Sequence, residues 1–123
     1  MINPSRIKRQ AAYQRGLSQE RIAAWLLRAK GYRILAQRYR SPYGEIDLIA
    51  RRGRVLIFIE IKARASLESA AFAITPHQQS RIRQTAEHFL AQHPRYLPKC
   101  QFRFDAVLCV PRRWPKHLKD AWR

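Results

Sequence analysis

Three carboxylates and a lysine lie within two short apolar stretches of a chain that otherwise avoids negative charge. Glu45 and Asp47 stand in Gly-Glu-Ile-Asp-Leu-Ile-Ala, and Glu60 and Lys62 stand in Phe-Ile-Glu-Ile-Lys-Ala-Arg. Only eight of the 123 residues are acidic. Carboxylates that gather on neighbouring strands repel one another unless a cation lies between them, and a divalent metal beside a bound phosphate supplies that cation. The pattern is typical of a nuclease.

The chemistry of phosphodiester hydrolysis explains why these residue types are needed together. The reaction places negative charge on the phosphoryl oxygens and the leaving oxygen, and Mg²⁺ or Mn²⁺ held by oxygen ligands stabilises that charge. Asp47 and Glu60 would hold the ion, with the backbone carbonyl of Ile61 as a candidate third ligand. Lys62 would either orient the attacking water or neutralise the transition state, and both roles stay open.

Local signals predict the elements that must position these residues. A helix is predicted from Leu17 to Lys30, with Ser18 as its N-cap and Gly31 as its stop. A second helix begins at Pro76, after a capping box at Thr75, and ends before Pro94. Strands are predicted at residues 32–39, 45–50, 55–63 and 101–110. The order is helix, three strands, helix, strand.

The second and third predicted strands form a hairpin, and its register decides whether the acids can meet. With Arg52 and Gly53 in the turn, Glu45 faces Glu60 and Asp47 faces Phe58. Opposed residues share a face, and so do residues two apart, whereas a slip of one residue would separate the acids. The side chains expected on one face are those of Glu45, Asp47, Glu60 and Lys62. The apolar side chains expected on the other face are those of Ile46, Leu48, Val55, Ile57, Ile59 and Ile61.

Charge and length limit the classes of protein to which the chain can belong. With 25 Lys and Arg against 8 Asp and Glu, the net charge is +17, which attracts polyanions such as nucleic acid. No stretch is apolar enough for a membrane span and the N-terminus lacks an apolar signal region, so we expect a cytoplasmic protein without membrane contact. One domain is expected. Its predicted parts are a basic N-terminal segment (1–16), a nuclease-like domain (17–110) and a basic tail (111–123).

The two acidic stretches resemble the YraN family of small uncharacterised bacterial proteins, which is similar to the PD-(D/E)xK nucleases and nearest to archaeal Holliday-junction resolvases. The resemblance implies an α/β fold with a restriction-endonuclease-like core, order αβββαβ, in which helices flank a mixed central sheet. It implies that Asp47 and Glu60 are metal ligands, that Lys62 is the catalytic lysine and that Glu20 is a further acid from the first helix. It also favours branched or structured DNA as substrate, and a homodimer.

The position of Glu20 can be interpreted from its own helix, and some residues near the motif differ from those of relatives. Glu20 lies on an apolar stripe of the first helix, where an acid needs a partner, but a first-turn glutamate is also favoured by the helix dipole. Where relatives carry Asn, Thr and Lys, this chain has Arg38, Ala63 and either Gln78 or Gln79, which bears on how substrate is positioned. The residues assigned to nucleic-acid contacts are Arg38, Arg40, Arg64, Gln78 and Arg81.

Several alternatives stay open at this point. The acids of the hairpin could pair with arginines in a solvated surface. The chain could be a non-catalytic nucleic-acid-binding module that keeps the nuclease fold, or an RNA-directed or ribosome-associated protein, because the charge suits both.

Asp105 is expected to pair with Arg103 or another basic side chain at the rim of the sheet, and the histidines are expected on helix surfaces and loops. The tail could stack on bases or dock through Trp114, and a charged terminus is more often mobile.

Overall fold

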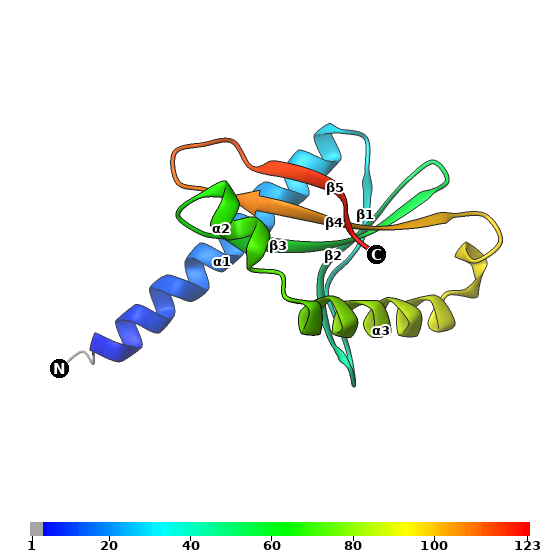
Figure 1. Ribbon diagram of the computed structural model, residues 1–123, viewed down its shortest axis with the longest axis horizontal. Coiled ribbons are helices and arrows are strands. Elements are labelled where there is room, and N and C mark those ends of the chain that lie inside the picture. The colour runs from blue at the N-terminus through cyan, green and yellow to red at the C-terminus, as the bar shows by residue number, and fades with distance from the viewer. Residues whose placement is uncertain (1–3) are drawn as a thin grey trace.

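The structure is a computed structural model that describes residues 4–123; within the first helix it describes side chains at Arg6 and from Ser18 onward. The helices and strands are, in chain order, α1 (Pro4–Ala29), β1 (Arg33–Ser41), β2 (Gly44–Arg52), β3 (Val55–Ala63), α2 (Leu67–Phe72), α3 (Pro76–Gln92), the short 3-10 helix η1 (Pro94–Tyr96), β4 (Gln101–Cys109) and β5 (Lys116–Trp122). One five-stranded sheet has the order β1-β2-β3-β4-β5. Figure 1 shows α1 and α3 on opposite sides of this sheet.

The sheet is mixed, as the family resemblance implied. Strands β3 and β4 are parallel, whereas the other neighbouring pairs are antiparallel. Parallel neighbours need a long crossover, and α2 and α3 supply it between β3 and β4. The α/β class with helices flanking a mixed sheet is therefore confirmed. The observed order differs from the predicted one by the additional elements α2, η1 and β5.

Helix α1 ends where the sequence indicated but begins much earlier. Gly31 adopts a φ of +90°, and the N–H of Tyr32 donates to the Leu27 carbonyl at 2.9 Å, which closes the helix as a glycine stop does. At the other end the helix begins at Pro4, so the prediction of Ser18 as N-cap was wrong. The reason is that arginine, lysine, glutamine and alanine continue a helix without any apolar periodicity. Helix α1 therefore runs through the boundary drawn between residues 16 and 17.

Two apolar cores lie on the two faces of the sheet. Helix α1 buries Ala23, Ala24 and Leu27 against one face, and α3 buries Ile82, Ala86 and Phe89 against the other. Strand β3 runs between the two cores, and its residues from Leu56 to Glu60 are all buried, as expected for a strand covered on both faces. The predicted N-cap of α3 is confirmed, because the Thr75 hydroxyl accepts from the Gln78 N–H at 3.2 Å.

The basic C-terminal segment forms a strand. Strand β5 pairs antiparallel with β4, and the Trp122 ring stacks on Phe104 with centroids 5.7 Å apart. The expectation of a mobile tail was wrong because this segment completes the sheet and buries one of its tryptophans. Trp122 is 7% exposed, whereas Trp114, in the loop before β5, is 82% exposed. In the described part of the chain, no helix is both long and apolar enough to cross a membrane.

Candidate active site

The β2–β3 hairpin has a different register from the predicted one. The pairs run from Leu48 with Ile59 to Arg52 with Val55, so that Ile49, rather than Asp47, faces Phe58. The turn is therefore formed by Gly53 and Arg54, and Gly53 adopts a φ of +59°, which glycine favours in a tight hairpin. The register differs from the prediction by two residues, and within the paired part of the hairpin, from Leu48 to Ile59, a shift of two keeps each side chain on its predicted face.

Strand β2 loses its regular alternation at Asp47. Ile46 packs in the core under α3 and Leu48 packs in the core under α1, although residues two apart in a regular strand share a face. The prediction that Ile46 and Leu48 point the same way was therefore wrong. Asp47 reaches across to β3, where its Oδ2 accepts the backbone N–H of Ile61 at 2.8 Å. The carboxylate is thus held between the strands.

Asp47, which is half-buried, and Glu60, which is buried, form an acidic pair. Glu60 is 8% exposed. Burial and, to a smaller extent, the neighbouring Asp47 raise the pKa of Glu60 to about 7, with Lys62 partly opposing both. Burial also raises the pKa of Asp47, although the Ile61 N–H and Lys62 act to lower it. The raised pKa values mean that the folded protein disfavours the ionised forms of these two carboxyl groups.

Lys62 is held in place beside this pair. Its Nζ lies 3.2 Å from Glu60 Oε1, and its side chain is 14% exposed. With the Gln78 amide oriented so that both of its ends find partners, the Gln78 oxygen accepts from Lys62 Nζ at 2.9 Å and its nitrogen donates to the Ala73 carbonyl at 3.1 Å. Gln78, expected to contact nucleic acid, thus orients the lysine. The sequence carries no signal for this contact between β3 and the start of α3.

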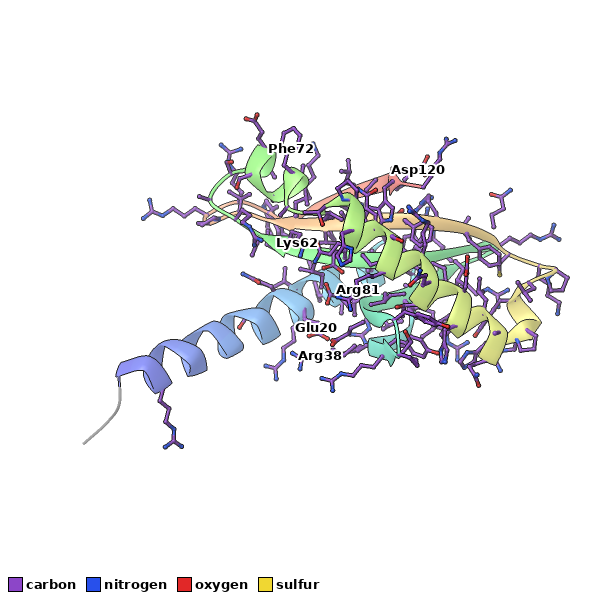
Figure 2. The ribbon with its side chains drawn as sticks, turned by 60° about the horizontal axis from the view of Figure 1, so that its bottom comes forward. Glu20, Arg38, Lys62, Phe72, Arg81 and Asp120 are labelled. Carbon is purple, nitrogen blue, oxygen red and sulfur yellow. The ribbon has the colours of Figure 1, made fainter. Side chains whose placement is uncertain are left out.

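Glu20 approaches the pair from α1 but is bound to an arginine. Its Oε2 accepts from Arg38 Nε at 2.9 Å, and its charge acts to raise the pKa of Asp47. Arg38 adopts a φ of +52°, rare for a residue other than glycine, in the middle of β1. Figure 2 shows Glu20 and Arg38 meeting on the side of the molecule where Arg81 and Lys62 also lie. Glu20 is thus held in an ion pair with Arg38.

The alternative in which the acids of the hairpin pair with arginines describes Glu45. Glu45 Oε2 lies 3.4 Å from Arg40 Nε, and the Arg40 side chain is 77% exposed. By contrast, Asp47 accepts the Ile61 N–H and Glu60 pairs with Lys62. Glu45 therefore belongs to the rim, and Asp47 and Glu60 belong to the centre of the candidate site.

The donor set at this centre limits what it could hold. Two carboxylates and a backbone carbonyl could coordinate a hard cation that keeps several of its waters. Among the described residues, no group of three or more histidine, cysteine, aspartate or glutamate side chains is placed to bind a metal. A small oxygen-coordinated ion such as Mg²⁺ suits this set, since Mg²⁺ rarely takes a cage built wholly of protein.

The remaining basic residues assigned to nucleic acid are exposed. Arg64 donates to the Ala63 carbonyl at 2.6 Å, directly after the motif lysine. Arg81 donates to the Tyr43 carbonyl at 3.1 Å and so joins α3 to the β1–β2 turn. Arg40, which pairs with Glu45, is exposed as well.

Asp105 accepts hydrogen bonds from three other residues. Its two oxygens accept from Arg103 at 2.8 Å each, as predicted, but also from His117 Nε2 at 2.7 Å and from the Asp120 N–H at 3.0 Å. The expected place at the rim was wrong, because Asp105 is completely buried. The expectation for the histidines was also wrong at His117, whose side chain is 0% exposed. Strand β5 brings His117 to Asp105.

The Asp105 network makes the stability of the fold sensitive to acid. Burial alone would raise the pKa of Asp105, but His117, Arg103 and the Asp120 N–H together lower it to about 2, from 3.8. A lowered pKa stabilises the folded state above pH 3.8, and this stabilisation is lost as the pH falls towards about 2. We expect the free energy of unfolding to drop by about 2 kcal/mol across this range because of Asp105.

Urea denaturation at several pH values between 5 and 2 measures this loss. The Asp105→Asn protein, compared with itself across the same range, should show a pH dependence smaller by that amount, because asparagine does not titrate. An unchanged pH dependence in this variant would contradict the assignment.

Comparisons with known proteins cover nearly the whole chain. A model of the family described as Uncharacterised protein family UPF0102 matches residues 19–109, which include Glu20, Asp47, Glu60 and Lys62. A UPF0102 protein of Nitrobacter winogradskyi is 55% identical over 114 residues, which are 93% of this chain and 96% of the relative. UPF0102 proteins of Parvibaculum lavamentivorans and Bradyrhizobium diazoefficiens are each 52% identical, over 92% and 99% of this chain and 84% and 89% of their own lengths. The chain therefore belongs to the UPF0102 family, which is the YraN family that its acidic motifs resemble.

Proposed function

We propose that this chain is a metal-dependent endonuclease that hydrolyses phosphodiester bonds in branched or structured DNA. The observation that carries the proposal is the pairing of the half-buried Asp47 with the buried Glu60, whose carboxylate lies 3.2 Å from Lys62 Nζ. A fold gains no stability from burying two acids together, so such a pair is expected at a functional site. The antiparallel β1–β2–β3 unit, the helical crossover and the parallel β4 are compatible with a restriction-endonuclease-like core.

The residues of the site have distinct roles in this proposal. Asp47 and Glu60, with the Ile61 carbonyl, would hold Mg²⁺ or Mn²⁺, and such an ion, when bound, stabilises charge on the phosphoryl oxygens and activates water. The Ile61 N–H keeps the Asp47 carboxylate between the strands. Lys62, held by Glu60 and Gln78, presents a positive charge to the phosphate or orients the water. Gln78 positions Lys62 and is not itself catalytic.

The surface charge supports a nucleic-acid substrate. A net charge of +17 draws a polyanion from solution, and the exposed Arg40, Arg64 and Arg81 would neutralise phosphates. A homodimer would place two such sites on the paired strands of a branched substrate, and we include this state in the proposal.

A non-catalytic nucleic-acid-binding module is the second candidate. It is favoured by Glu20, the further acid expected at the site, whose carboxylate is instead paired with Arg38 at 2.9 Å. In that case the basic surface binds nucleic acid while the acidic pair does not turn it over.

Incubation of the purified protein with labelled DNA separates the two candidates. Four-way junction, flap, single-stranded and duplex DNA are each incubated with Mg²⁺, with Mn²⁺ or with EDTA. The proposal expects cleavage of the branched substrates with metal, none with EDTA, and loss of cleavage with retained binding in Asp47→Ala. Binding without cleavage under both metals favours the module, and unchanged cleavage in Asp47→Ala would refute the assignment of the site.

A further inference from the structure

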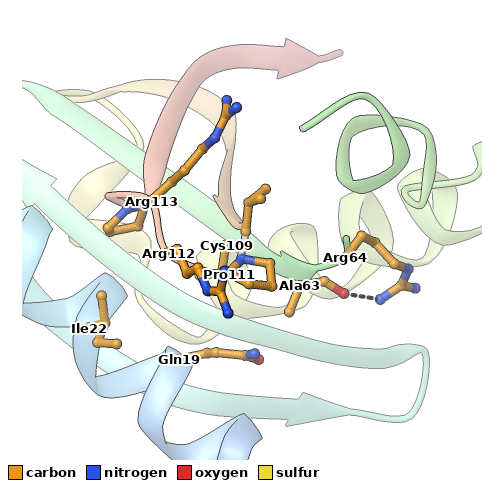
Figure 3. A pocket seen from close by; sticks show the side chains of 10 residues that line it. Gln19, Ile22, Ala63, Arg64, Cys109, Pro111, Arg112 and Arg113 are labelled. Carbon is orange, nitrogen blue, oxygen red and sulfur yellow. Dashed lines mark hydrogen bonds between the residues drawn. The ribbon is translucent and has the colours of Figure 1, made fainter. Parts of the chain in front are cut away.

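A pocket of about 420 Å³ opens where the end of β3, the β4–β5 loop and α1 meet (Figure 3). The residues that line it include Gln19 and Ile22 of α1, Arg64 after β3, and Cys109, Arg112 and Pro115 around the loop. We propose that this pocket binds an unpaired nucleotide of the DNA, which would make DNA with a single-stranded segment beside the cut the substrate class. This inference rests on the proposed function and names the substrate of that site.

The pocket adjoins the candidate active site through two segments of the chain. On α1, Gln19 of the pocket directly precedes Glu20, and at β3, Ala63 and Arg64 of the pocket directly follow Lys62. Successive residues of a strand point to opposite faces, so Lys62 and Ala63 face the two sides of the end of β3. A DNA strand that passes the end of β3 therefore meets the acidic pair and the pocket in succession.

The charge of the pocket suits a phosphate backbone. Arg64, Arg112 and Arg113 line it, and none of the described lining residues is acidic. Arg112 has a φ of +63°, a conformation uncommon for residues other than glycine, which is found where a loop is held in a particular shape. Figure 3 shows its side chain directed towards α1, whereas the Arg113 side chain points away from α1. This loop conformation puts a guanidinium over the pocket.

The apolar side chains of the pocket suit a base rather than an anion alone. Ile22, 45% exposed, lines the pocket together with Pro111 and Pro115 of the loop. Trp114 does not line the pocket but is 82% exposed at its edge in the sequence, between the lining residues Arg113 and Pro115. An exposed tryptophan beside arginines is the combination on which single-stranded nucleic acids stack, and each stacked base contributes roughly 1–3 kcal/mol. In a duplex the base faces are already stacked on their neighbours, so only an unpaired base can use Trp114.

The size of the pocket also favours a single unpaired nucleotide over a duplex. Its volume lies at the lower end of the range of small-molecule sites, roughly 300–1,000 Å³. A DNA duplex is wider than its own major groove, which is about 12 Å across, so a duplex cannot enter a space of this size. One splayed nucleotide with its phosphate near Arg112 uses both the basic and the apolar parts.

The test measures binding without metal, so that it does not depend on cleavage. Fluorescence anisotropy in EDTA compares a labelled DNA duplex carrying a single-stranded overhang with the blunt duplex. The full-length protein should bind the overhang substrate about tenfold more tightly, since one stacked base contributes about 1.4 kcal/mol. Trp114→Ala should lose this preference and keep its affinity for the blunt duplex. Arg112→Ala should weaken binding of the overhang substrate more than binding of the blunt one.

The control variant is Phe102→Ala, which removes an exposed aromatic ring at the opposite end of β4 and should retain the preference. Equal binding of both substrates by the unmodified protein, or a preference that persists in Trp114→Ala, would overturn the inference. Tighter binding of an RNA overhang of the same sequence would overturn the choice of DNA. Because no metal is present, the preference can hold for a protein that never cleaves, so failure of this inference and failure of the proposed function are observed separately.

Discussion

The Glu60→Gln protein is expected to lose cleavage by roughly 100-fold or more and yet to resist urea better than the unmodified protein. The loss of cleavage follows from the removal of one of two carboxylates that would hold the metal. The gain in stability follows from burial: Glu60 is 8% exposed beside Asp47, and the pKa of Glu60 is raised to about 7 by burial and by that neighbour. Relieving this repulsion should raise the free energy of unfolding in EDTA by about 1 kcal/mol.

Metal binding gives a readout that does not depend on activity. Mg²⁺ that binds the folded state stabilises it by mass action, so the melting temperature of the unmodified protein should rise with Mg²⁺ concentration. The same titration should leave Glu60→Gln unchanged. Glu45→Gln is the matched control, because Glu45 lies on the adjoining strand but is exposed and paired with Arg40 at 3.4 Å. It should keep its cleavage, its stability within about 0.5 kcal/mol and its response to Mg²⁺.

Two outcomes would contradict this account of the pair. A Glu60→Gln protein that cleaves as well as the original removes Glu60 from the site. A variant that loses cleavage and also loses several kcal/mol of stability shows instead that Glu60 supports the fold through its ion pair with Lys62.

The Asp105→Ala protein is expected to be less stable by about 3–5 kcal/mol, the typical effect of removing one partner from a buried ion pair. Asp105 is completely buried, and it accepts from Arg103, from His117 and from the Asp120 N–H. Alanine would leave these donors without their acceptor, and two of them join β5 to β4. Because the total stability of a small domain is only about 5–15 kcal/mol, we expect partial loss of the folded state near 37 °C.

Urea denaturation at neutral pH measures this effect. Glu87→Ala is the control, because Glu87 is an exposed acid on α3, and its removal should change the free energy of unfolding by no more than about 0.5 kcal/mol. A loss below about 1 kcal/mol in Asp105→Ala would mean that water replaces the carboxylate, and the network would then not hold β5. Hydrogen exchange in β5 distinguishes these cases, because the variant should exchange first in that strand.

The elements beside the motif could be predicted because their signals are local. Strand β3 has the predicted limits, Val55–Ala63, since a continuous apolar run ends at a glycine turn on one side and at polar residues on the other. Glu60 and Lys62 share a face as predicted despite an error of two residues in the hairpin register, because the strand period is also two. Asp47 lies where the alternation of β2 is lost, and it is held by the Ile61 N–H instead. Elements with weak local signals were missed. The first half of α1 lacks an apolar stripe, and β5 has the composition of a charged tail.

The sequence by itself determined the order of the predicted helices and strands, the pairing of acidic motifs on one hairpin, and the family. Only the tertiary structure decided that Asp47 binds the Ile61 N–H, that Gln78 holds Lys62, and that Glu20 is bound to Arg38. The physical reason is that periodicity assigns a side chain to a face of its own element, whereas these contacts depend on how separate elements pack. The pocket at the end of β3 arises in the same way, because α1 and the β4–β5 loop meet there only in the folded chain.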